Sequence, residues 1–154
     1  MLLKIGGKDY KLEYTFEAAL HEKCVEKVVE LFGSIAAANE AEEGTVSESI
    51  AKDAFKQMVG IPRTTITLLY AGLLEHNPVE TEEDAKALLK QYFKENPEAE
   101  NATFYGMLTG ILGQMEEDGF FKQIGLVEEP ESQPKEPQDH KKKAPAKRAT
   151  AKSS

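Results

Sequence analysis

The chain begins with MLLKIGGKDYKLEYT (residues 1–15), in which two short alternating segments flank the pair Gly6-Gly7. The apolar members of the two segments are Leu3, Ile5, Tyr10, Leu12 and Tyr14. Glycine pairs supply the positive φ angles that a two-residue hairpin turn requires, so this stretch predicts a β-hairpin before an otherwise helical chain. Since a lone two-stranded ribbon is marginal in water, its apolar face must lie on the helices or on another chain. Whether the hairpin also offers a strand edge to a partner stays open at this point.

The first predicted helix follows the hairpin directly. Thr15 is a suitable N-cap, and apolar residues recur at three-to-four spacing from Phe16 to Ile35, opposite a charged face. Residues 36–44 are small and acidic, which is typical of a loop. We therefore expect one amphipathic helix that ends before residue 36.

Two further helices are predicted on either side of Gly60. Residues 45–48 have the spacing of a capping box, and the helix that follows them is expected to stop at Gly60. Pro62 suits the first turn of the next helix, which ends at Asn77-Pro78. That helix is apolar nearly all round, as expected of a central helix or of one covered by a partner.

The last two predicted helices each begin at a capping residue. Residues 81–84 cap a helix whose apolar residues run from Ala85 to Phe93. Asn101 caps the final helix, which closes at Gly119. Together these patterns predict a mainly α fold, with an N-terminal β-hairpin followed by a compact bundle of about five helices.

Two features near the end of the final helix are candidate contacts for a partner. Three glycines share one face of this helix, and because each costs about 1 kcal/mol relative to alanine, either another backbone approaches there or the helix is pliable. A large apolar group follows Gly119 and would mark an interaction site if exposed. For both features, packing within the domain is favoured over contact with a partner. The candidate partner-binding residues are Gly106, Gly110, Gly113, Phe120, Phe121 and Ile124.

Charge and cysteine content narrow the class of protein. The chain has 19 lysine and arginine residues against 27 aspartate and glutamate residues, a net charge of -8. Since seven of the basic residues lie in residues 135–152, the preceding body is strongly acidic and a poor general binder of nucleic acid.

Cys24 is the only cysteine, which suits a reducing compartment. No apolar run has the length of a signal peptide or a membrane span, so we expect a cytosolic protein that does not contact the membrane.

The sequence lacks the residue patterns of common enzymes. We find no glycine-rich phosphate loop, no cysteine or histidine pair at metal-ligand spacing and no nucleophile elbow. The three histidines, at positions 21, 76 and 140, lie far apart in the sequence. His76 precedes Asn77-Pro78 and is best interpreted as a cation at a helix C-terminus. We therefore expect no catalytic, cofactor-binding or metal-binding site.

The composition changes near residue 127. We place the helical domain at residues 1–126 and a segment rich in proline and lysine at residues 127–154, which is predicted to be disordered because it lacks aromatic residues. Its basic end has two interpretations. It could contact phosphate groups in a salt-sensitive manner. The favoured alternative is a solubilising segment, or a remnant whose codons matter more than its charges.

This layout resembles the tail assembly chaperones of long-tailed bacteriophages and prophages, in particular the type found in Gram-positive hosts. The resemblance covers roughly residues 1–126. It rests on LKIGGKDYKL (residues 3–12) followed at once by residues 14–32, on LLYAGLLEHNP (residues 68–78) with the acidic cap after it, and on a helix that closes before Phe120.

The resemblance implies a nonstructural protein of the host cytoplasm, absent from the mature virion. Such a protein binds the tape measure protein and helps the tail tube protein assemble around it. Members of this family often have a longer form made by a programmed ribosomal frameshift, through whose extension the tube protein would be bound. Lys141-Lys142-Lys143 can be encoded by an unbroken adenine run on which such a slip could occur.

Other assignments stay open at this stage. One is a structural head-tail connector or minor tail protein, and another is a small nucleic-acid-associated protein that uses the basic segment. Whether the protein forms a homo-oligomer is also open.

Overall fold

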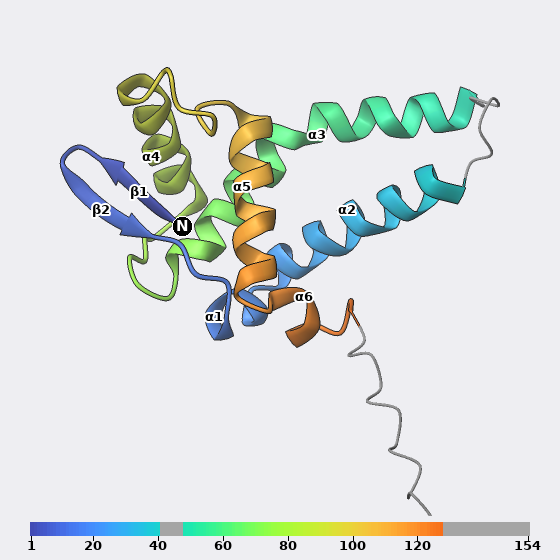
Figure 1. Ribbon diagram of the computed structural model, residues 1–154, viewed down its shortest axis with the longest axis horizontal. Helices are drawn as coiled ribbons and strands as arrows, with labels where there is room; N and C mark the ends of the chain where they lie inside the picture. The colour runs from blue at the N-terminus through green and yellow to red at the C-terminus, as the bar shows by residue number, and fades with distance from the viewer. Residues whose placement is uncertain (41–47, 128–154) are drawn as a thin grey trace, which may run out of the picture.

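The computed structural model describes residues 1–40 and 48–127. It is mainly helical, with an N-terminal hairpin, as the sequence predicts (Figure 1). The elements are β1 (Leu2–Ile5), β2 (Lys8–Lys11), α1 (Phe16–Leu20), α2 (Glu22–Glu40), α3 (Glu48–Leu73), α4 (Glu82–Glu95), α5 (Phe104–Glu117) and α6 (Phe120–Gln123). The predicted disorder beyond residue 127 and most of the predicted capping box at residues 45–48 lie outside the described residues.

The predicted hairpin is confirmed. Strands β1 and β2 pair antiparallel, with Ile5 opposite Lys8, and the two glycines between them have φ angles of 59° and 76°. These positive angles are those of the tight turn that matches the twist of paired strands. The hairpin packs against α4, where the Gly6 N–H donates to Glu95 Oε2 at 2.8 Å. That hydrogen bond holds the pKa of the Glu95 carboxyl below its ordinary value.

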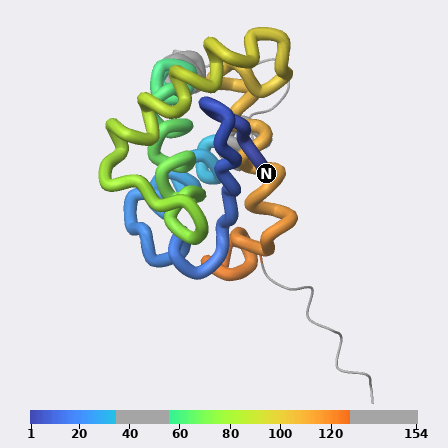
Figure 2. Tube along the Cα trace, turned by 90° about the vertical axis from the view of Figure 1, so that its left-hand side faces the viewer, coloured from blue at the N-terminus to red at the C-terminus, as the bar shows by residue number. Residues whose placement is uncertain are grey.

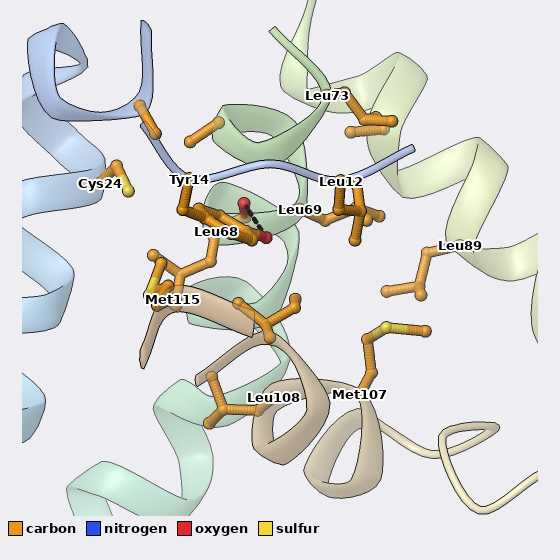
Figure 3. Close-up of a cluster of buried hydrophobic side chains, with 14 of the residues drawn as sticks. Leu12, Tyr14, Cys24, Leu68, Leu69, Leu73, Leu89, Met107, Leu108 and Met115 are labelled. Atoms are coloured by element: carbon orange, nitrogen blue, oxygen red, sulfur yellow. Dashed lines mark hydrogen bonds between the residues drawn. The ribbon is translucent and has the colours of Figure 1, made fainter. Parts of the chain in front are cut away.

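The segment after β2 fastens the hairpin to α3. Leu12 and Tyr14 are fully buried, and the Glu13 N–H between them donates to the Gly72 carbonyl at 3.0 Å. The Tyr14 hydroxyl donates to the Leu68 carbonyl at 2.9 Å, the contact drawn as a dashed line in Figure 3. A chain segment that enters the core in this way must satisfy its polar groups there, and these hydrogen bonds do so for the Glu13 N–H and the Tyr14 hydroxyl.

The second half of α3 is the centre of the core, as its apolar composition predicts. Helix α3 contacts α1, α2, α4, α5 and β2, and in Figure 2 α2 and α5 lie on different sides of it. The largest fully buried side chains around it include Leu68, Leu69, Leu73, Met107, Ile111 and Met115. Close packing of this many apolar side chains supplies the main driving force for folding.

The first predicted helix is wrong in one respect, since it is broken at His21. Residue His21 has the extended angles φ -82° and ψ 101°, which separate α1 from α2. The predicted cap at Thr15 forms no capping hydrogen bond, and its hydroxyl donates to Glu13 instead. His21 caps α2, because its Nδ1 accepts the Cys24 N–H at 3.1 Å.

Two predicted breaks are also wrong. Residues 36–40 are the end of α2 and not a loop, consistent with the high helix propensity of their three alanines. Helix α3 runs through Gly60 and Pro62 without interruption. Proline removes one backbone donor, but the Thr65 hydroxyl adds a bond to the Ile61 carbonyl at 2.7 Å, and α3 packs on α2. The two halves of α3 run in different directions (Figure 1), as expected of a helix with an internal proline.

The caps of the later helices are partly as predicted. Thr81 and Asp84 form the reciprocal bonds of a capping box at the start of α4. The N-cap of α5 is Thr103 and not Asn101, whose side chain accepts the Tyr92 hydroxyl at 2.6 Å. Gly119, with a φ angle of 72°, ends α5 as predicted, and the short helix α6 follows it.

Candidate partner-binding groove

The three glycines of α5 do not form one open surface. A Cβ atom at Gly106 would lie 2.1 Å from the Glu100 carbonyl oxygen, so this glycine permits a close approach within the chain itself. At Gly110 the nearest atoms belong to the Met1 side chain, at 3.5 Å. A Cβ at Gly113 would meet nothing within 4 Å. Only Gly113 of the three therefore faces open space.

The apolar group of α6 packs on the core. Phe120 is fully buried, with its ring edge-on to Tyr14 at a centroid distance of 6.2 Å. Phe121 is half-buried against Phe32, at 4.9 Å between ring centroids. Ile124 is also half-buried against the core. This placement agrees with the docked arrangement that the sequence interpretation favours, and it leaves Phe120 out of reach of a partner.

A different surface is hollowed between α2, the second half of α3 and the start of α4. It consists of two adjoining hollows of about 600 Å³ and 520 Å³. We call it the α2–α4 groove and define it by its lining residues: Leu20, His21, Glu22, Lys23, Glu26, Lys27, Pro62, Arg63, Ile66, Thr67, Tyr70, Thr81, Glu82, Glu83 and Lys86. No residue of this set belongs to the candidates predicted from the sequence.

The floor of the groove is an apolar stripe along α3. Pro62, Ile66 and Tyr70 are each half-buried and follow one another at intervals of four residues, so they share one face of the helix. The ring of His21 lies edge-on to Tyr70, at 5.3 Å between centroids. Beside it Leu20, the last residue of α1, is 66% exposed. Because the helix is broken at His21, Leu20 lies at the edge of the groove. In a continuous helix this leucine would belong to the buried apolar stripe.

The walls of the groove carry charges of both signs. Lys23 on α2 and Glu82 on α4 face each other across it, with Nζ and Oε1 3.8 Å apart, at the junction of the two hollows. Glu82 also accepts the Thr67 hydroxyl at 3.4 Å, which places its carboxylate over the floor. Exposed ion pairs of this kind contribute little free energy, so a partner can displace them at small cost.

The remaining cations of the groove differ in whether they are paired. Lys86 pairs with Glu83 at 3.1 Å and Lys27 pairs with Glu30 at 3.0 Å. Arg63 is exposed and has no ion pair with any of the residues described. The groove therefore combines an apolar floor with a guanidinium beside it that pairs with no carboxylate in the described part of the chain.

Two ionisable groups with perturbed titration belong to the core and not to the groove. Burial raises the pKa of the Tyr14 hydroxyl well above its ordinary value, and the nearby Cys24 and Asp118 add to this effect. Burial also raises the pKa of the Cys24 thiol to about 12. Both groups are therefore neutral near pH 7, and neither is accessible for a reaction.

The described residues contain neither a metal-binding cluster nor a membrane-spanning helix. Over residues 1–40 and 48–127 we find no cluster of three histidine, cysteine or carboxylate side chains placed to hold a metal ion. None of the helices in the described part of the chain combines the length and apolar character that crossing a membrane requires.

Comparisons with protein-family models, with curated protein sequences and with solved structures give no match to this chain.

Proposed function

We propose that this protein is a tail assembly chaperone of a long-tailed bacteriophage, which binds the tape measure protein and promotes assembly of the tail tube around it. The observation that carries this proposal is the α2–α4 groove, with its apolar floor and charged walls. A long helical protein offers amphipathic helices, and a groove of this kind accepts such a helix by burying the apolar face.

The acidic surface of the body supports the same proposal. A chaperone that holds an aggregation-prone partner must keep the complex in solution, and a high net charge opposes association between complexes. The proposed site of action is the host cytoplasm, and the protein leaves before the virion matures. The proposed second partner is the tail tube protein, bound through a frameshifted extension beyond Lys141-Lys142-Lys143.

Co-expression with the tape measure protein of the same phage tests the proposal. We expect the full chain to raise the soluble yield of the tape measure protein and to co-purify with it. Leu20→Glu should abolish both effects, because it places a charge at the edge of the groove. Leu2→Glu is the matched control, since Leu2 is 61% exposed on the hairpin and does not line the groove.

The protein content of purified virions separates the alternatives. We expect the protein to be absent from mature particles in quantitative mass spectrometry. Its presence as a stoichiometric tail component would contradict the chaperone assignment and favour a connector or minor tail protein. Retention on DNA that is salt-sensitive and lost on deletion of residues 128–154 would instead favour the nucleic-acid-associated protein.

A further inference from the structure

We infer that the α2–α4 groove selects an amphipathic helix of the tape measure protein in which a carboxylate flanks the apolar stripe and pairs with Arg63. This inference rests on the proposed function and adds the kind of segment that is bound. It commits to one occupant, a single partner helix that lies along α3.

The spacing of the floor residues favours a helix over an extended segment. Pro62 and Tyr70, the ends of the row, are eight residue steps apart along α3, a length of about 12 Å at the rise of an α-helix. A partner helix that lies along this row can place its own residues at intervals of three and four against it. Leu20 continues the apolar surface at the Tyr70 end, where it is 66% exposed.

The charge pattern determines which flank of the partner helix must be acidic. Lys23 and Lys86 are already paired with glutamates of α4, whereas Arg63 is unpaired among the described residues and adjoins the floor. A guanidinium carries its charge at every physiological pH and binds a carboxylate through two parallel hydrogen bonds. The surrounding body is acidic, so a carboxylate on a partner helix in the groove finds a favourable contact at Arg63.

An opposing charge on the α2 wall restricts the match further. Glu26 on the α2 wall is exposed and has no ion pair with the other described residues. A partner helix acidic on both flanks would meet repulsion there. The complementary helix therefore has its carboxylate on the Arg63 side and a neutral or basic residue on the Glu26 side.

A charge-reversal experiment tests the inference. Overlapping synthetic peptides that cover the tape measure protein of the same phage are titrated against the full chain, and binding is followed by fluorescence anisotropy. We expect the tightest peptides to have an apolar stripe with a carboxylate on one flank. Arg63→Glu should weaken their binding at least about tenfold. Lys4→Glu, a charge reversal at an exposed lysine of the hairpin, is the matched control and should leave binding unchanged.

A compensating change in the peptide provides the stronger readout. Replacing the flanking acid of the tightest peptide by lysine should weaken its binding to the wild-type protein and restore binding to Arg63→Glu. Restoration cannot result from a folding defect, because a misfolded variant would not gain affinity for the altered peptide. Equal binding by Arg63→Glu and the wild-type protein would overturn the inference, and so would a failure of the altered peptide to restore binding.

Other occupants of the groove have their own signatures. If deletion of residues 128–154 raises peptide affinity tenfold or more, a part of that deleted segment occupies the groove and the inference is overturned. A dimer in sedimentation velocity that Arg63→Glu dissociates would assign the groove to a second copy and would likewise overturn it. Full-length tape measure protein that co-purifies equally with wild type and Arg63→Glu leaves the proposed function standing while the inference fails. If wild type does not bind the tape measure protein, the proposed function itself fails.

Discussion

Gly72→Ala tests whether the hairpin is fastened to α3 in the way the structure describes. A Cβ atom at this position would lie 2.5 Å from both Cζ and Oη of Tyr14, far inside van der Waals contact. The ring can move only by disturbing its neighbours, because Tyr14 is fully buried and packs edge-on against Phe120. Overpacking of a core costs about 1 to 3 kcal/mol, so we expect a loss of unfolding free energy in this range.

The hydroxyl of the same tyrosine gives the second arm of a double-mutant cycle. Tyr14→Phe removes the hydrogen bond to the Leu68 carbonyl at 2.9 Å and should cost about 1 kcal/mol. In the Gly72→Ala background the ring has already been displaced from this bond, so the same change should cost less. We expect a coupling of at least about 0.5 kcal/mol, measured by urea unfolding of the full chain followed by far-UV circular dichroism.

Gly33→Ala is the control for the effect of alanine in a helix. A Cβ at Gly33 in α2 would meet no atom within 4 Å, so the substitution should stabilise the protein by up to about 1 kcal/mol. The two glycine substitutions are therefore expected to have opposite signs. A stabilising Gly72→Ala, or strictly additive effects of the Gly72 and Tyr14 substitutions, would refute the proposed contact.

Three further predictions concern other parts of the fold. His21→Ala should destabilise the protein by about 1 kcal/mol in urea unfolding, whereas His21→Asn should retain the cap on the Cys24 N–H. Leu69→Ala and Leu108→Ala should each cost on the order of 2 to 5 kcal/mol, because both side chains are buried, and smaller losses would contradict their core positions. Hydrogen bonding to His76 lowers the pKa of Glu13 from its ordinary value of 4.5. The contribution of the ionised Glu13 carboxylate to the free energy of unfolding is therefore present above pH 4.5 and is lost as pH falls through the lowered pKa. Glu13→Gln should remove this part of the acid dependence of stability, measured by urea unfolding at a series of pH values.

The elements that the sequence predicts well are those whose signals are local. The hairpin depends on Gly6-Gly7 and on alternation over a few residues, and the α4 cap depends on Thr81 and Asp84 at a spacing of three. The apolar character of residues 66–74 likewise predicts a central helix without knowledge of its neighbours. In the hairpin turn and the α4 cap the interacting groups lie within a few positions of one another, so a short stretch of sequence contains the whole interaction.

The mispredicted boundaries depend on contacts between distant residues. No glycine or proline near His21 predicts the helix break there. The imidazole cap depends on the position of the ring beside Tyr70, which is a contact between distant residues. Conversely, Gly60 and Pro62 are strong local signals for a break, but packing on α2 maintains α3 through both. Tertiary packing overrides local propensity at these positions.

The groove could not be predicted from the sequence, because its lining comes from three segments. The one available signal is the i, i+4, i+8 row of Pro62, Ile66 and Tyr70, which crosses the position where the sequence predicts a new helix to begin. Taken as one helix, that row would have marked an apolar stripe on a partly exposed face. The close approach of the Tyr14 ring to Gly72 cannot be predicted either, because these two residues lie far apart in the sequence.

The arrangement of the hairpin bears on where a partner can bind, because an exposed strand edge is the main alternative to the groove. The outer edge of β2 carries Lys8, Asp9 and Lys11, and charged side chains on a short edge strand oppose pairing with another strand. One of its outward donors, the Lys11 N–H, is already taken by Asn77 Oδ1 at 2.9 Å. The edge of the other strand, β1, is not free in the same way, because β1 packs against α4. The hairpin therefore serves to close the core, and the floor of the α2–α4 groove offers a helical partner an apolar surface elsewhere on the molecule.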